Sequence, residues 1–76
     1  MEIAVSARKH GVADRDILHA IAFPIREVRQ CDVDRVLIIG AEAACRLLEV
    51  VVLDPDEDDP VVVHAMELRP KFRRFL

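Results

Sequence analysis

The most constraining feature of this 76-residue chain is a central segment that is apolar on both sides of an expected β-strand. From Arg46 to Leu53, every residue except Arg46 and Glu49 is apolar. Successive side chains of a strand point to opposite faces, so this pattern places apolar groups on both faces of a sheet. Such a strand has to be covered on both sides. We therefore expect a layered domain.

Two helices are expected before Pro24. The first covers residues 4–10 and is closed by Gly11, because glycine readily adopts the left-handed conformation that follows a helix. The second begins at Ala13 or at Asp14, whose side chain is the better cap. It ends before Pro24, because proline pushes the preceding residue out of helical geometry.

The inner side of the second helix can be read from spacing. Val12 and Ile17 have the separation of a hydrophobic staple, in which the residue before the cap packs on the fourth helical residue. Ala20 and Ile21 follow at helical spacing. We expect these four side chains to be buried, with Leu18 at the margin of the stripe.

After the helices the hydrophobic period changes to that of strands. Four strands are expected, over residues 25–29, 33–39, 46–53 and 61–68. A turn at 30–32, a loop at 40–44 and a Pro-bracketed acidic loop at 54–60 connect them. The first strand is polar and suits a sheet edge. Residues 70–76 form a short terminal helix with Pro70 at its first position.

The sequence thus predicts one α+β domain over residues 1–76. Its expected architecture is two N-terminal helices, a four-stranded antiparallel meander and a short C-terminal helix. The two helices can cover only one face of so small a sheet. The terminal helix, a second copy or a partner chain must cover the other. We favour a partner, because the terminal helix is very short.

Composition excludes some classes of protein. Apolar residues make up 53% of the chain, which is too many for a disordered protein. The net charge of -3 argues against a general nucleic-acid binder. However, five acids lie in residues 54–59, and without them the chain carries +2. Residues 64–76 alone carry +3, which makes the C-terminus the one nucleic-acid-like part of the sequence.

The chain shows no sign of membrane, cofactor or metal. No apolar run is long enough to span a bilayer, and the first residues lack the pattern of a signal peptide, so we expect a cytoplasmic protein. Cys31 and Cys45 have no metal-binding spacing. A central hairpin would separate them by far more than a disulfide allows, so we expect free thiols. The acidic loop lacks the spacing of a calcium site.

Four segments resemble the BrnT family of bacterial toxins. They are Lys9-His10-Gly11-Val12, similar to the family's KHGV motif, Arg35–Gly40, Arg46–Val52 and Val62–Arg69. The resemblance implies a small ribonuclease with a RelE-like fold, belonging to a type II toxin–antitoxin pair. It also implies a cognate antitoxin, a small DNA-binding protein that covers and silences the toxin, and mRNA or the ribosome as the target.

The residues offer a matching chemistry. Metal-independent RNA cleavage needs a base, an acid and cations that stabilise the phosphorane. The candidate catalytic residues are His64, Arg46 and Glu49, and the candidate phosphate-binding residues are Arg69, Lys71, Arg73 and Arg74. We expect Arg46, His64 and Arg69 to lie near one another at one end of the sheet.

Each candidate also has a structural alternative. In a regular strand His64 shares its face with apolar Val62, Met66 and Leu68, so it could be a histidine hydrogen-bonded inside the sheet. Arg46 could form an ion pair at a strand end, and parity places it opposite to Glu49 unless it lies in the loop.

Other side chains have simpler explanations. His10 suits a helix C-terminus, and His19 lies on a helix rim. Phe72, Phe75 and Leu76 have the spacing of a helix's buried side.

Two rival functions therefore stay open. One is a non-catalytic interaction module or homodimer with the same fold, suggested by the doubly apolar strand. The other is a nucleic-acid adaptor that binds through its basic C-terminus. RNA binding by such an adaptor would weaken steeply with salt.

Overall fold

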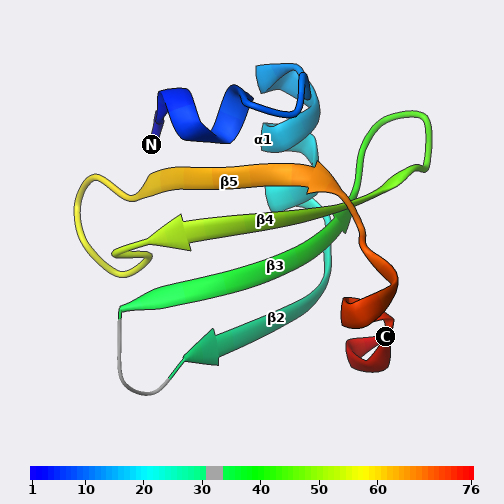
Figure 1. Cartoon of the computed structure of the whole chain (residues 1–76). Helices are drawn as coiled ribbons and strands as arrows, with labels where there is room; N and C mark the ends of the chain where they lie inside the picture. Colours follow the sequence, from blue (N-terminus) through cyan, green and yellow to red (C-terminus); the bar gives the residue numbers. More distant parts are fainter. Residues whose placement is uncertain (31–33) are drawn as a thin grey trace.

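The computed structural model describes residues 1–30 and 34–76 as a mixed sheet with one α-helix (Figure 1). In chain order the elements are β1 (Glu2–Ile3), the 3-10 helix η1 (Val5–Arg8), α1 (Asp14–Ala22), β2 (Pro24–Gln30), β3 (Arg35–Ala41), β4 (Leu47–Leu53), β5 (Val61–Glu67) and the 3-10 helix η2 (Pro70–Phe75). No helix among these residues is long and apolar enough to cross a membrane.

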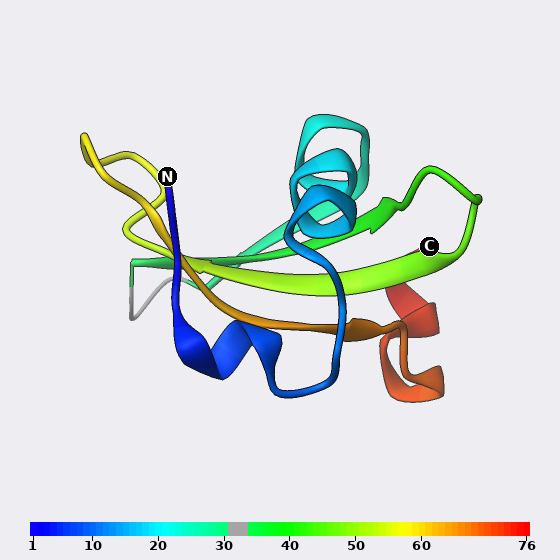
Figure 2. The same cartoon turned by 90° about the horizontal axis from the view of Figure 1, so that it is seen from above.

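The sheet has five strands in the order β1-β5-β4-β3-β2. β2 to β5 form an antiparallel meander, and β1 adds to the outer side of β5 in parallel. Figure 2 shows α1 on one face of the sheet and η2 on the other. The short η1 runs along the β5 edge. The fold is thus α+β, with α1 over one face of the meander and the short η2 over only part of the other (Figure 2).

The predicted architecture is wrong in its helices and in its sheet. The segment predicted as a helix over 4–10 holds only the four residues of η1, so a single α-helix precedes the meander in the described chain. The terminal helix is also of the 3-10 type. The sheet is five-stranded and mixed because β1 pairs with a strand almost sixty residues later. A two-residue strand leaves no periodicity that a sequence could reveal.

Some predictions lie outside the described residues. These are the free thiol of Cys31, most of the turn at 30–32, and the start of the second strand at Val33. Gln30, predicted to begin that turn, is the last residue of β2. Cys45 is a free, exposed thiol.

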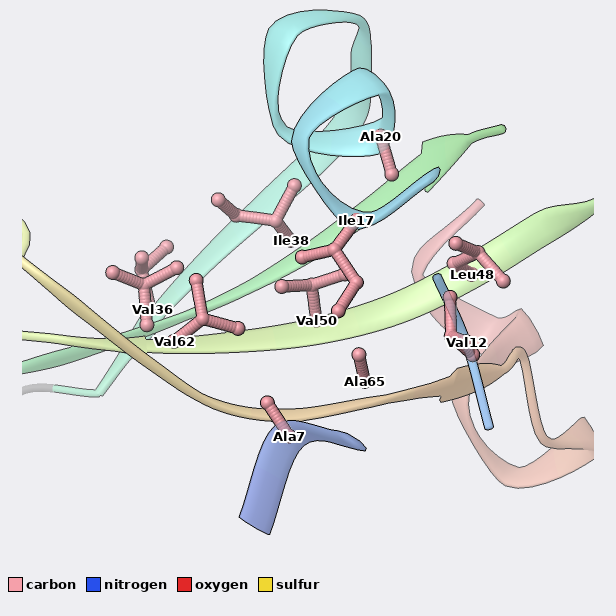
Figure 3. Close-up of a cluster of buried hydrophobic side chains, with 11 residues drawn as sticks. Ala7, Val12, Ile17, Ala20, Val36, Ile38, Leu48, Val50, Val62 and Ala65 are labelled. Carbon is pink, nitrogen blue, oxygen red and sulfur yellow. The ribbon is translucent and has the colours of Figure 1, made fainter. Parts of the chain in front are cut away.

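The hydrophobic core lies between α1 and the sheet (Figure 3). Alternate residues of β3 and β4 point into it, together with two residues of β5 and the stapled pair Val12 and Ile17. The buried cluster consists of Ala7, Val12, Ile17, Ala20, Val36, Ile38, Leu48, Val50, Val52, Val62 and Ala65. Ile21 packs against this cluster, whereas Leu18 is exposed.

A β-bulge interrupts the alternation in β5. Val51 pairs with His64, but the next residue of β4, Val52, pairs with Val62, so Val63 has no partner across β4. The Ser6 hydroxyl of η1 donates to the Val63 carbonyl over 2.8 Å. Because one residue is inserted, Val62 points into the core while His64 points to the opposite face. The prediction that His64 and Val62 share a face is therefore wrong.

Close contact between α1 and β3 depends on Gly40. A Cβ atom at this position would lie 2.1 Å from the Ala20 carbonyl oxygen. We predict that Gly40→Ala destabilises the domain by about 3 kcal/mol, since backbone atoms cannot yield as a side chain would. Urea unfolding measures the free energy of unfolding of the wild type and of the variant. Gly11→Ala is the control, because Gly11 has open space but a φ of +76°. That change should cost only about 1 kcal/mol, and an equal cost at both sites would contradict the prediction.

The β3–β4 hairpin places Cys45 in a strained conformation. Cys45 has a φ of 69°, and its N–H donates to the Glu42 carbonyl over 2.8 Å. The left-handed region is unfavourable for residues other than glycine, because it brings the Cβ atom too close to the following carbonyl oxygen. Cys45→Gly should therefore raise the free energy of unfolding by roughly 0.5–1 kcal/mol. Ala43→Gly in the same hairpin should lower it, because the φ of Ala43 is not positive. A thermal melt of both variants compares them directly.

Candidate functional site

The candidate site is built around a buried carboxylate in the middle of the sheet. Glu49 has an exposed fraction of 0%. It lies in β4 between Leu48 and Val50, which point into the core, so its own side chain points to the face that carries η2. A charged group in such a position has to be paired to be tolerated.

Arg69 supplies most of that pairing. Its backbone N–H donates to Oε1 of Glu49 over 2.9 Å, and its Nε lies 3.0 and 3.1 Å from the two carboxylate oxygens. Its Nη2 donates to Oε2 over 2.7 Å. Arg69 immediately precedes η2, so this contact also fixes where the C-terminal segment leaves the sheet.

His64 completes the group from the neighbouring strand. Its Nε2 lies 2.9 Å from Oε2 of Glu49. Because a carboxylate only accepts, Nε2 carries the proton and Nδ1 is left to act as an acceptor when the ring is neutral. The side chain of His64 is 26% exposed, so solvent reaches it. The bulge at Val63 is what brings it to the same face as Glu49.

The charge state of Glu49 follows from these contacts. Burial alone would raise its pKa, but the hydrogen bonds from the Arg69 side chain and N–H and from His64 outweigh burial, so the pKa of Glu49 is lowered. Glu49 is therefore ionised at neutral pH. A carboxylate held by so many donors is a poor proton acceptor, so its role is to orient His64 rather than to act as the base that the sequence suggested.

A second imidazole lies beside His64. The rings of His10 and His64 meet edge to face, with their centroids 5.7 Å apart. His10 is exposed and comes from the segment between η1 and α1. Sequence reasoning gave it only a helix-terminal role. Only the packing of η1 along β5 brings together two histidines so distant in the chain.

The basic C-terminal residues surround the aromatic rings of η2. Lys71, Arg73 and Arg74 are exposed. The guanidinium carbon of Arg69 and the Nζ of Lys71 lie 5.2 and 5.0 Å from the Phe72 ring centroid. No residue of η2 is buried and Leu76 is exposed, so the prediction of a buried helix side is wrong even for the half-buried Phe72. Its ring stands next to Arg69 and therefore next to the Glu49 group.

Arg46 lies outside this group. It falls in the loop before β4, and its Nη2 lies 3.5 Å from Oε2 of Glu42. Glu42 is almost fully buried. The structure thus brings His64, Glu49 and Arg69 together but gives Arg46 a different partner, in line with the ion-pair alternative.

A hollow adjoins the site on the same face of the sheet. Its lining consists of Val28, Gln30, Arg35, Leu37, Val51, Phe72, Arg74 and Phe75. Val51 is the cross-strand partner of His64, so the hollow begins beside that histidine. η2 therefore covers only part of this face.

Comparison with known proteins assigns no family, since no family model, curated protein or solved structure matches this chain. Within residues 1–30 and 34–76, no group of three or more His, Cys, Asp or Glu could hold a metal ion. The side chains of the site offer proton transfer by histidine and charge stabilisation by arginine and lysine.

Glu49→Gln tests the energetic importance of the carboxylate. The variant keeps the shape but loses a charged acceptor, so we expect about 2 kcal/mol of destabilisation at pH 7. Folding lowers the pKa of Glu49, so the carboxylate contributes fully to the free energy of unfolding at pH values above its ordinary pKa of 4.5. It is lost as the pH falls through the lower folded value.

The difference between wild type and Glu49→Gln should thus be constant above about pH 5.5 and shrink in acid. Chemical denaturation across pH measures it. Glu67→Gln, at an exposed position of β5, is the control and should change stability little. A gap that widens in acid would contradict the assignment.

Proposed function

We propose that this protein is a toxin-like, metal-independent endoribonuclease that acts on mRNA in the cytoplasm and is held inactive by an antitoxin. The observation that carries the proposal is a partly exposed His64 oriented by the buried, ionised Glu49. The resemblance of four segments to BrnT toxins supports the same reading.

His64 has the arrangement expected of a general base. Its Nε2–H is fixed on Glu49, so Nδ1 can take the proton of a ribose 2′-hydroxyl. The oxygen then attacks the adjacent phosphorus, forming a 2′,3′-cyclic phosphate and breaking the bond to the 5′-oxygen. Glu49 stabilises the imidazolium that results.

The leaving 5′-oxygen needs a proton, and His10 is placed to supply it. Its ring meets the His64 ring edge to face at a centroid distance of 5.7 Å. A phosphodiester bound beside both rings can therefore place the neighbouring 2′-hydroxyl at His64 and its own 5′-oxygen at His10. Two histidines, one neutral and one protonated, provide both halves of the proton transfer. His10 thereby shares with His64 the acid–base roles that the sequence-based hypothesis gave to His64 and Glu49.

Cations near the histidines can hold the phosphate. Arg69 is 40% exposed although its Nε and Nη2 are bonded to Glu49. Lys71, Arg73 and Arg74 extend the positive charge along η2 and interleave with Phe72 and Phe75. Such a surface can bind the backbone of a single-stranded RNA while an aromatic ring stacks on a base.

The hollow beside η2 favours a second candidate, a non-catalytic interaction module. Its apolar floor of Val28, Leu37 and Val51 is only half-buried, with Arg35 and Arg74 at its rim. An antitoxin segment with acidic and apolar side chains would fit the same surface. If the protein is an interaction module, binding of such a segment in the hollow is its whole function, and it does not cleave RNA.

An assay of RNA cleavage distinguishes the endoribonuclease from the non-catalytic interaction module. Expression of the chain alone should slow bacterial growth, and the purified protein should cut single-stranded RNA in the presence of a chelator. His64→Gln should reduce the rate by 10² to 10⁴-fold, the usual range for a general base. His19→Gln is the matched control, because His19 bonds to the Ala41 carbonyl on the α1 side of the molecule and should leave cleavage intact.

Three results would contradict the enzymatic proposal. They are normal growth, intact RNA, or equal rates for the two histidine variants. Salt-sensitive RNA binding without cleavage would instead indicate the adaptor.

A further inference from the structure

One edge of the sheet is open. β2 pairs with β3, and its other side has no strand among the described residues. Proteins usually protect such an edge with proline, lysine or a bulge. β2 has a proline and a register shift only at its start, between Pro24 and Arg26. From Glu27 to Gln30 the strand is regular and has neither a proline nor a bulge, so its charged side chains decide what can pair with it.

The hydrogen bonds of the sheet show which backbone groups face that edge. The N–H of Asp54 donates to the Asp34 carbonyl just beyond one end of the β3–β4 ladder, and the N–H of Glu42 donates to the Arg46 carbonyl beyond the other. Hydrogen-bonded pairs alternate along an antiparallel ladder. Even-numbered residues of β3 therefore bond to β4, and odd-numbered ones face β2.

The same alternation continues into β2. Arg35 and Leu37 pair with Gln30 and Val28, so these two residues of β2 turn their backbone groups toward β3. The N–H and C=O groups of Glu27 and Arg29 consequently point to the open edge. Any strand that adds there must bond to those two residues.

A second copy of β2 can do so in antiparallel orientation, and side-chain charge selects one register. Pairing Glu27 with Glu27, or Arg29 with Arg29, opposes like charges. Pairing Glu27 of one copy with Arg29 of the other opposes unlike charges at two symmetric places. Directly opposite residues interact strongly enough to decide between these registers.

We propose that two copies of this chain pair through their β2 edges, with Val28 on the two-fold axis and Glu27 opposite Arg29 of the partner copy. The arrangement joins two five-stranded sheets into one and is isologous, as expected of a symmetric dimer. The proposal is independent of RNA cleavage.

The other groups facing this edge are compatible with the pairing. On the η2 face Arg26 meets Gln30 of the partner copy, which introduces no like charge. Arg29 also holds Asp56 of its own chain at 2.9 and 3.1 Å, so each arginine lies between two carboxylates. The two half-buried Val28 side chains meet on the axis, which joins the apolar hollows of the two copies.

Charge reversal tests the register. Sedimentation over a concentration series should show a dimer of the wild type. Glu27→Arg or Arg29→Glu alone turns both cross-strand pairs into like charges and should raise the dissociation constant about tenfold. The double variant E27R/R29E should restore wild-type affinity, although it also loses the Arg29–Asp56 contact. A monomeric wild type, or a double variant as weak as the singles, would overturn the proposal.

Cross-linking gives a second readout. In a chain with Cys31→Ser and Cys45→Ser, Val28→Cys should oxidise to a disulfide-linked dimer, because residue 28 meets its own copy. Gln30→Cys should stay unlinked, since its partner is Arg26. Linkage through residue 30 in preference to residue 28 would overturn the proposed register.

Discussion

The structure depends on how the carboxylate of Glu49 is accommodated. Glu49 is fully buried in a strand that is otherwise apolar, and an unpaired charge there would cost several kcal/mol. Arg69 and His64 remove that cost by donating to both oxygens. In doing so they attach the C-terminal segment to the sheet and fix one imidazole. Stability and any chemistry at this face therefore depend on the same hydrogen bonds.

The bulge at Val63 makes that arrangement possible. In a regular β5, His64 would point into the core with Val62. The inserted residue rotates His64 to the face of Glu49 while leaving Ala65 in the core. η1 stabilises the bulge, because Ser6 bonds to the carbonyl of the unpaired residue. The same segment carries His10 to the ring of His64.

Much of the fold could be predicted from local patterns. The helix with Ile17 on its inner side, the staple residue Val12 before it and the four meander strands follow from periodicity and from proline. β1 could not be predicted, because two residues have no period and their partner is distant in sequence. The extent of η1 was overestimated for a related reason, since a short segment gives little evidence for an α-helix over a 3-10 turn.

The candidate site divides in the same way. The sequence by itself determined the inventory: one acid inside the most apolar strand, three histidines, and a basic C-terminus with interleaved phenylalanines. Tertiary structure alone decided which of them meet. His64 joins Glu49 because of a bulge, Arg46 turns to Glu42, and His10 approaches from the sheet edge. Residue type and period are local properties, whereas strand register and edge packing are set by contacts between distant segments, and these place the side chains of the site.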